Sequence, residues 1–269
     1  MSNLQQTARR MVWMRHIPGF KAWNRLFFRR EYPALSREVF GLRFSHPLGL
    51  APVLDRQADL LDECDSLGFS FSGIIPGNMP VKTIAERLSA RRTGIIAAVE
   101  LRADGSSEDQ ARDGLIRTYS LLYDFADYFV VDVNRQTGQT SFDGISDWSD
   151  ILDELLNLRL CYERYTPIIL RLPPAPSEGH SERLLDFCLL SGIDGVVVPG
   201  ADQVARTFQY TKGRLPIIGS GAITSSAEAV SMLKAGAGLI EVAQGIPSCG
   251  RSTSRRILQA VDKTAYPSS

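Results

Sequence analysis

The sequence predicts a (β/α)8 barrel that follows a short N-terminal helical extension and a small hairpin. Three observations predict this fold: eight short apolar segments follow residue 48, a helical pattern follows each of them, and glycines end the last two. Strands that are buried on both faces of a parallel sheet are nearly continuous apolar runs. Eight such strands, each followed by a helix, close into a barrel. An open doubly wound sheet is the structural alternative.

The elements follow one another at short intervals along the chain. The predicted strands are 48–53, 69–75, 94–101, 128–133, 167–172, 195–199, 216–221 and 239–245. The predicted helices lie near 56–67, 81–91, 107–124, 146–163, 181–191, 202–210, 226–236 and 252–262. Ser225 followed by Glu228 is a capping-box signal at the start of one of these helices. Residues 37–47 predict a hairpin that covers the apolar interior at the bottom of the barrel.

The composition is that of a globular protein whose charge is unevenly distributed. The chain has 269 residues, of which 44% are hydrophobic, and this is sufficient for one large domain with a core. Residues 1–30 hold seven cations and no acid, so the remainder carries 23 cations and 30 acids, a net charge of −7. We therefore divide the chain into a basic N-terminal segment, residues 1–32, and a barrel, residues 33–269.

Several classes of protein are disfavoured. The four cysteines lie far apart without a CxxC pair and the three histidines are scattered, so neither a metal site nor a disulfide framework is predicted. No apolar run is long enough to span a bilayer. The net acidic barrel argues against nucleic acid as a partner. The expected location is cytoplasmic.

The N-terminal segment interleaves its cations with large apolar side chains. These are Met11, Val12, Trp13, Met14, Phe20, Trp23, Leu26, Phe27 and Phe28. Basic residues mixed with bulky aromatics are typical of interfacial helices on anionic lipid, and Pro18 and Gly19 would divide this segment into two short helices. We expect residues 1–30 to hold the protein at the inner face of a membrane. The alternative is docking against the barrel, or against a partner in a homo- or hetero-oligomer.

Glycines end the last two predicted strands, where a barrel of this kind commonly grips phosphate. The first turn contains Gly219, Gly221 and Ala222, and the second contains Gln244 and Gly245. Backbone N–H groups at such turns can bind an anion. A tight turn from strand to helix requires glycine whether or not a ligand binds, so this interpretation stays open beside the first.

Six segments carry a resemblance to a known family. They are 35–54 (LSREVFGLRFSHPLGLAPVL), 68–71 (GFSF), 126–133 (ADYFVVDV), 192–198 (GIDGVVV), 214–221 (RLPIIGSG) and 235–239 (AGAGL). Together they resemble dihydroorotate dehydrogenase, and the basic N-terminus and the FGLRFSHP stretch are most similar to its membrane-associated, quinone-reducing class. The resemblance runs from about residue 33 to residue 262. It implies a barrel that binds FMN and oxidises dihydroorotate to orotate in pyrimidine biosynthesis.

The residues that would perform this chemistry are altered. At the family's base position this chain has Arg135, which has no lone pair to accept a proton. The two substrate-binding asparagines correspond to Asp132 and Thr137. The family also has polar residues after the sixth strand that bind orotate, and this chain has Gly200 there. A carboxylate at position 132 would repel the orotate carboxylate by roughly 4 kcal/mol at about 4 Å and an effective dielectric constant of about 20. The simpler interpretation is that Asp132 and Arg135 pair with each other.

Of the positions that would contact the flavin, some are kept in this chain and others are altered. Ala51 matches the first-strand pattern, but Pro52 and Val53 follow it where small residues let the flavin ring lie against backbone. Arg171 stands at the position of a lysine that contacts the ring; it keeps the charge in a bulkier, forked group. An asparagine of the third strand is replaced by Ala98. These changes predict that FMN binds weakly or not at all.

Three functions therefore remain open at this point. The first is a catalytically impaired relative that keeps at most a phosphate- or FMN-type binding site. The second is an active, FMN-dependent dihydroorotate dehydrogenase with a rearranged site. The third is a non-enzymatic protein that binds a membrane surface or a partner.

Overall fold

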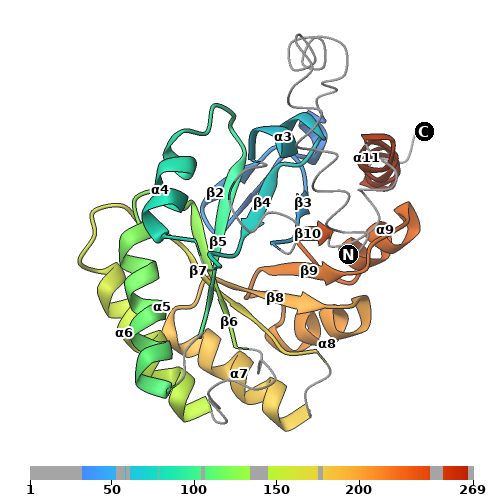
Figure 1. Cartoon of the computed structure of the whole chain (residues 1–269). Coiled ribbons are helices and arrows are strands. Elements are labelled where there is room, and N and C mark those ends of the chain that lie inside the picture. The colour runs from blue at the N-terminus through green and yellow to red at the C-terminus, as the bar shows by residue number, and fades with distance from the viewer. Residues whose placement is uncertain are drawn as a thin grey trace.

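The computed structural model describes residues 32–52, 58, 61–77, 79–103, 107–133, 145–174, 178–242 and 251–265. Eight parallel strands form a closed barrel in the order β10-β3-β4-β5-β6-β7-β8-β9, so the last strand pairs with the first (Figure 1). They are β3 (Leu48–Leu50), β4 (Phe71–Ile74), β5 (Ile96–Arg102), β6 (Tyr128–Asp132), β7 (Ile168–Arg171), β8 (Gly195–Pro199), β9 (Ile217–Gly221) and β10 (Leu239–Val242). The predicted closed barrel is confirmed, and the open sheet is not formed.

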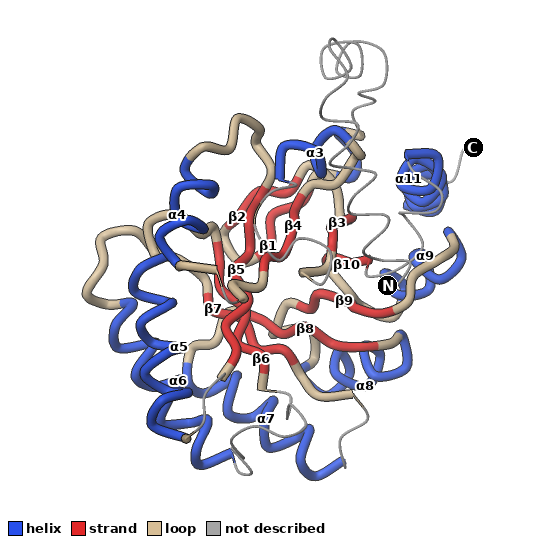
Figure 2. The backbone as a smooth tube through the Cα atoms, viewed as in Figure 1, coloured by secondary structure: helices blue, strands red, loops and turns tan. Residues whose placement is uncertain are grey.

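A helix follows each barrel strand, as predicted. The helices are α3 (Leu61–Ser66), α4 (Val81–Ser89), α5 (Glu108–Leu122), α6 (Ile145–Arg159), α7 (Glu178–Ser191), α8 (Ala201–Thr211), α9 (Ser226–Lys234) and α11 (Arg251–Ala265). Figure 2 shows the strands gathered at the centre with the helices around them. Several strands are shorter than predicted; β3, for example, ends at Leu50 instead of continuing to residue 53.

A hairpin closes the bottom of the barrel, which confirms the prediction for residues 37–47. Strands β1 (Arg37–Val39) and β2 (Leu42–Phe44) are antiparallel and are joined by Phe40 and Gly41, whose φ angles are 55° and 75°. Two central residues with positive φ are typical of the two-residue hairpin turn. A Cβ atom on Gly195 would lie 2.3 Å from the Phe40 ring, so only glycine lets this ring enter the barrel.

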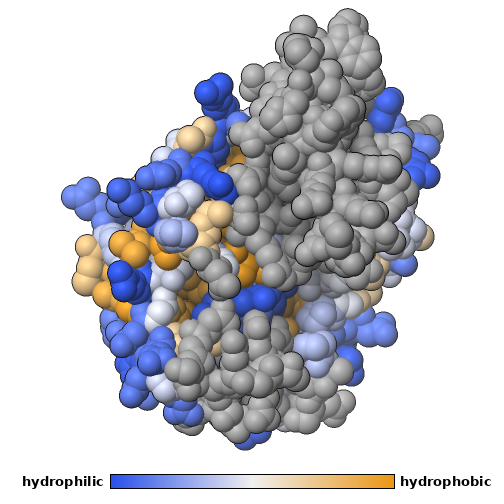
Figure 3. All heavy atoms as spheres, viewed as in Figure 1, coloured by the Kyte–Doolittle hydropathy of each residue, from blue (hydrophilic) through white to orange (hydrophobic). Residues whose placement is uncertain are grey.

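The side chains of the strands alternate between two apolar layers, because successive residues of a strand face opposite sides of the sheet. The inner cluster fills the barrel and consists of Phe44, Phe71, Ala98, Tyr128, Val130, Ile169, Val197, Ile218 and Leu239. The ring of Phe44, from the hairpin, packs edge-on against Phe71 at 5.5 Å between centroids. The other face of each strand packs against the helices, whose outer surfaces carry mainly hydrophilic side chains (Figure 3).

Local signals in the sequence account for the helix starts. The Ser225 hydroxyl accepts a hydrogen bond from the Glu228 N–H at 3.2 Å, and the Glu228 carboxylate accepts from the Ser225 N–H at 2.9 Å, which completes the predicted capping box. The Ser107 hydroxyl caps α5 in the same way by accepting from the Gln110 N–H.

The predicted helices of residues 1–30 fall outside the described residues, and the domain boundary at residue 32 stays a prediction. Within the described part of the chain, no helix has both the length and the apolar character needed to cross a membrane.

Candidate functional site

Because the barrel strands are parallel, their last residues meet at one end of the barrel, which we call the carboxyl rim. These residues are Leu50, Ile74, Arg102, Asp132, Arg171, Pro199, Gly221 and Val242. Inside the barrel, at and just below this rim, five charged side chains meet. We call them the ionic cluster: Glu100, Arg102, Asp132, Arg171 and Glu241.

The alternation of each strand directs these five side chains inward. In β7, Ile169 belongs to the inner cluster and Arg171 comes two residues later. In β10, Leu239 is followed in the same way by Glu241. Strands β5 and β6 repeat the pattern, since Ala98 precedes Glu100 and Arg102, and Val130 precedes Asp132. The ionic cluster is therefore the next layer of the barrel interior above the inner cluster.

Arg171 spans the barrel interior and holds two carboxylates. Its Nε donates to Glu100 Oε2 at 2.8 Å, and its Nη1 donates to Glu241 Oε1 at 2.7 Å. Its Nη2 also lies 2.8 Å from Glu100 Oε2, but at an angle that makes no hydrogen bond to any described residue. That close approach is therefore an electrostatic contact. Glu100 and Glu241 are only 2% and 4% exposed.

Arg102 contacts Glu100 as well, and it also approaches the third acid, Asp132. Its Nε and Nη2 donate to Glu100 Oε1 at 2.8 and 2.6 Å, so Glu100 bridges two guanidinium groups. The Arg102 Nε also lies 3.5 Å from Asp132 Oδ2, and Arg102 and Asp132 are register partners on neighbouring strands. With three carboxylates and two guanidinium groups, the ionic cluster carries a net charge of −1 when all its groups are ionised.

Burial and charge shift the pKa values in this layer. Burial alone would lower the pKa of Arg171, but the carboxylates of Glu241 and Glu100 outweigh it, so the pKa is raised and the side chain stays cationic. Burial raises the pKa of Glu241 even though Arg171 opposes the shift. One layer below, burial and the nearby Glu241 raise the pKa of Tyr128. The cluster is thus held together by a permanent cation between two buried acids.

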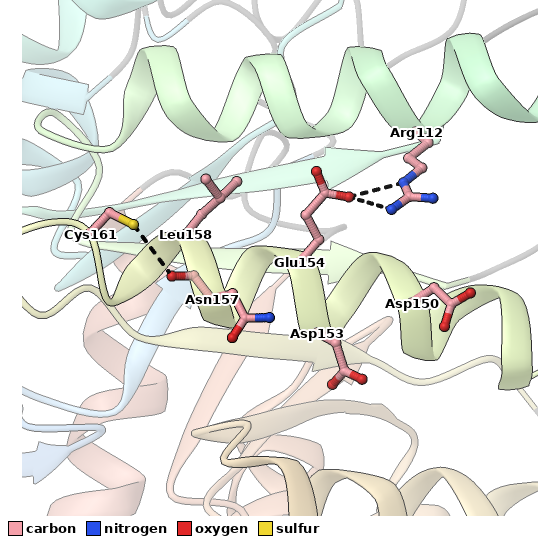
Figure 4. A pocket seen from close by; sticks show the side chains of 7 residues that line it. All are labelled: Arg112, Asp150, Asp153, Glu154, Asn157, Leu158 and Cys161. Atoms are coloured by element: carbon pink, nitrogen blue, oxygen red, sulfur yellow. Dashed lines mark hydrogen bonds and ion pairs between the residues drawn. The ribbon is translucent and has the colours of Figure 1, made fainter.

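An open hollow on the outside of the barrel has a different character. It lies on helices α5 and α6 and is lined by Arg112, Asp150, Asp153, Glu154, Asn157, Leu158 and Cys161 (Figure 4). Arg112 donates from Nε and Nη2 to Glu154 Oε2 at 3.0 and 2.5 Å. Because its one cation is already paired and its other charges are acids, this hollow offers no constellation for catalysis. We therefore place the candidate site at the carboxyl rim.

The chain is similar to known proteins over most of its length. No known family model matches the chain. The chain is 26% identical over 316 residues to a dihydroorotate dehydrogenase (quinone) from Alkalilimnicola ehrlichii, and the match covers 93% of each protein. It is 26% identical over 301 residues to the protein of the same name from Aeromonas salmonicida, covering 86% of this chain and 88% of that protein.

Solved structures show the same fold. A DHODH from Eimeria tenella, crystallised with ferulenol, superposes with a TM-score of 0.76 at 18% identity and covers 97% of this chain and 91% of that one. A mandelate oxidase solved with an FMN adduct gives a TM-score of 0.58 at 15% identity, covering 87% of this chain and 78% of that one. The chain is a dihydroorotate-dehydrogenase-like barrel.

Flavoenzymes of this fold imply FMN, and the described ring-side residues of this dihydroorotate-dehydrogenase-like barrel do not fit its ring. Arg171 keeps a positive charge at the expected position, but two buried carboxylates already neutralise it. Ala51 is only 4% exposed. Pro52 lies over β4, with its Cδ 2.8 Å from where a Cβ on Gly73 would be. The space beside the first strands is thus covered by the chain itself.

Ala98, expected at a ring-contacting position, lies deeper than Arg171. It is 2% exposed and belongs to the apolar inner cluster beside the hairpin. The inward side chain of β5 that reaches Arg171 is Glu100, two residues further along. The residue of this strand that would face a flavin ring beside Arg171 is therefore an acid, not alanine.

The phosphate side of the rim is more open. Among the described residues, a Cβ on Gly200 would meet no atom within 4 Å, and one on Gly221 would have the Gly200 nitrogen as its nearest neighbour at 3.9 Å. Gly219 instead faces the helices, because a Cβ there would lie 2.4 Å from Met232 of α9. Helix packing is thus sufficient to explain Gly219. Ala222, just beyond the rim, is exposed.

Five of the site residues singled out in the sequence lie outside the described residues: Val53, Arg135, Thr137, Gln244 and Gly245. The predicted pairing of Asp132 with Arg135 is therefore untested, while Arg102 is an ion-pair partner of Asp132 that sequence reasoning missed. Glu100 and Glu241 were missed as well. The signal that could have found all three is an acid or arginine at an inward position of an otherwise apolar strand, since such residues are rarely buried unless paired.

Among the described residues, no group of three His, Cys, Asp or Glu side chains is arranged to hold a metal ion.

Proposed function

We propose that this protein is a catalytically impaired relative of dihydroorotate dehydrogenase that acts through binding or assembly. The observation that carries the proposal is Asp132. Its carboxylate is 6% exposed and lies 3.5 Å from Arg102, at the position where the resemblance places a substrate-binding asparagine. An anionic substrate beside it would be disfavoured by roughly 4 kcal/mol at about 4 Å and an effective dielectric constant of about 20, which corresponds to roughly a thousandfold weaker binding.

Two further positions support the loss of turnover. Arg135 occupies the base position and cannot accept a proton at physiological pH. Removing a general base commonly lowers the rate by about 10²–10⁴-fold. Gly200, which follows β8, has no side chain with which to hold the substrate.

The altered residues also bear on cofactor binding. We propose that FMN binds weakly or not at all, because Pro52 covers the strand end and the cation of Arg171 is already paired. The turn at Gly221 and Ala222 would still accept a phosphate group through backbone N–H groups, since a Cβ on Gly221 would meet no described atom closer than 3.9 Å. Gln244 and Gly245 would complete this phosphate site.

One observation favours the second candidate, an active dihydroorotate dehydrogenase with a rearranged site. The chain is similar to curated quinone-reducing enzymes along 93% of its length. In that case, a side chain at another position would act as the general base, and other residues would bind the substrate in place of those of the family.

The test is a turnover assay of the purified full chain with dihydroorotate, added FMN and a quinone or an artificial electron acceptor. We expect orotate formation at background, with an authentic quinone-type dihydroorotate dehydrogenase as the positive control. Arg135→Ser alone should not restore turnover, because Asp132 and Gly200 would still fail to hold the substrate. Sustained orotate formation by the unmodified chain would establish the second candidate instead.

We also propose that residues 1–30 hold the protein at an anionic membrane surface. Seven cations and no acid support this, since each cation near such a surface contributes about 1 kcal/mol. Liposome binding should need acidic lipid, weaken as salt rises and disappear when residues 1–30 are deleted. A deletion that changes the oligomeric state and leaves lipid binding at background in both forms would show partner docking instead.

A further inference from the structure

We propose that the ionic cluster is an internal replacement for the flavin ring, with Glu100 and Glu241 as the residues that exclude the cofactor. The inference rests on the proposed function and deepens it, because it names a cause for weak flavin binding and gives the cluster a structural role. Three features carry it: the place of the cluster, the hydrogen bonds of Arg171 to two carboxylates, and the pairing of its positive charges.

The cluster fills the barrel interior at the level where a ring would lie. Arg171 reaches from β7 to Glu100 on β5 and to Glu241 on β10, which are two and three strands away around the barrel. All three side chains lie directly above the apolar inner cluster. A planar ring placed against Arg171 would have to displace at least one of these two carboxylates.

Two of the three guanidinium nitrogens of Arg171 already donate to carboxylates. Nε and Nη1 each make a short hydrogen bond to a carboxylate, and Nη2 is buried against Glu100 with no hydrogen bond to any described residue. Charge-assisted hydrogen bonds of this kind are among the strong ones. A flavin would have to compete with two fixed carboxylates for the same guanidinium group.

The charge of the cluster opposes a reduced flavin in particular. A reduced, anionic flavin requires positive charge nearby, and both guanidinium groups of the cluster are already paired with carboxylates. Adding another anion beside two buried acids would raise the energy of the site, because charges in a low-dielectric interior interact strongly.

The same contacts explain how the barrel stays closed without a cofactor. A ring that is simply lost would leave a void at the carboxyl rim, and the lining of a void loses its packing contacts. Here the arginines and carboxylates meet one another across that space. We therefore expect the barrel to fold fully in the absence of FMN.

The first test uses the natural full chain. It is unfolded in urea, freed of any bound flavin, and refolded with and without FMN. We expect the same recovery and the same unfolding midpoint in both cases, because a ligand that does not bind cannot stabilise the native state. Recovery that depends on FMN, or a midpoint that rises with FMN concentration, would overturn the inference.

The second test neutralises the two acids while keeping their shape, with Glu100→Gln/Glu241→Gln. Freed from its carboxylates, Arg171 should attract the flavin, and FMN should bind at least about tenfold more tightly than to the natural chain when titrated by flavin fluorescence. The matched control is Glu154→Gln on the outer surface, which also removes an arginine partner and should leave FMN binding unchanged. A folded double variant that binds FMN no better than the natural chain would contradict the inference.

If the double variant does not fold, Glu241→Gln alone keeps the two contacts between Glu100 and Arg171 and should strengthen FMN binding in the same direction, by less. If neither variant folds, the refolding experiment, which uses the natural chain, still tests whether the ionic cluster excludes FMN. Its outcome is also separable from turnover: flavin bound without orotate formation would refute the ionic cluster as an excluding device and leave the proposed loss of catalysis standing.

Discussion

The two ends of the barrel close its interior by different physical means. At the bottom, an apolar hairpin packs the rings of Phe40 and Phe44 against the inner cluster. At the carboxyl rim, three buried carboxylates and two arginines do the same task. The two closures are separated by only one or two inward-facing layers.

The two closures differ in how much change they tolerate. Apolar packing at the bottom is non-directional and tolerates change if volume is kept. A buried ionic layer must satisfy each charge, and loss of one partner leaves the others uncompensated. An ionic closure at the functional end of a barrel therefore limits which ligands can enter, while an apolar closure at the other end only stabilises the fold.

The strongest test of the ionic closure is Arg171→Met. It leaves Glu100 and Glu241 buried without their shared cation, and breaking a buried ion pair in this way lowers stability by about 3–5 kcal/mol. Urea unfolding monitored by circular dichroism measures the change. Arg112→Met, which removes a surface arginine from Glu154, serves as the control and should leave the unfolding midpoint unchanged. A loss for Arg171→Met no larger than that of the control would mean that the cluster contributes little.

The corresponding test of the apolar closure is Phe44→Ala. Phe44 is fully buried between the hairpin and Phe71, so its removal leaves a cavity, and such changes lower stability by about 3–5 kcal/mol. Unlike the change at Arg171, this loss should be nearly independent of pH, because no titratable group loses its partner. The measurement is urea unfolding at several pH values. A loss that varies steeply with pH would show that the two closures are coupled.

Sequence reasoning predicted the bottom of the barrel better than the rim. Continuous apolar runs and regular spacing were sufficient for the eight strands, the helices and the hairpin, because those features depend on burial alone. Glu100 and Glu241 were not singled out, because the cation that joins them, Arg171, comes from a strand about 70 residues distant from each. Pairing across the barrel is a tertiary property that periodicity does not specify.

The altered site residues were predictable only in part. Asp132 and Arg171 were found because they replace residues of a resembling family, and the structure places both in one cluster. The pairing of Asp132 with Arg135 was expected as the simpler interpretation of two opposite charges close in sequence, and nothing in the sequence pointed to Arg102 on the neighbouring strand. The strand register brings Arg102 opposite Asp132.

A smaller effect on stability is expected from Gly195→Ala, where the hairpin meets strand β8. The added Cβ would lie 2.3 Å from the Phe40 ring and 2.8 Å from the Pro216 carbonyl oxygen, which is backbone and cannot move aside easily. Overpacking of this kind lowers stability by about 1–3 kcal/mol. The double variant Gly195→Ala/Phe40→Leu should recover part of the loss by relieving the ring contact, as measured by thermal unfolding. An unchanged midpoint for Gly195→Ala would show that the hairpin does not press against this strand.

The smallest expected effect is a change in the pH dependence of stability at Glu241. Burial raises the pKa of this carboxyl in the folded protein despite Arg171, so the folded state holds the proton more tightly than the unfolded state does. The stability that this provides is present below the unfolded pKa, about 4.3 for a glutamate, and is lost as pH rises through the folded value. Glu241→Gln removes the titration, so the variant's stability should fall less than that of the natural chain across this pH window. Urea unfolding at closely spaced pH values measures both slopes, with Phe44→Ala as a variant whose slope should match the natural chain. If Glu241→Gln leaves the slope unaltered, the acid does not titrate differently on folding, and the ionic closure would then be insensitive to pH in the same way as the apolar one.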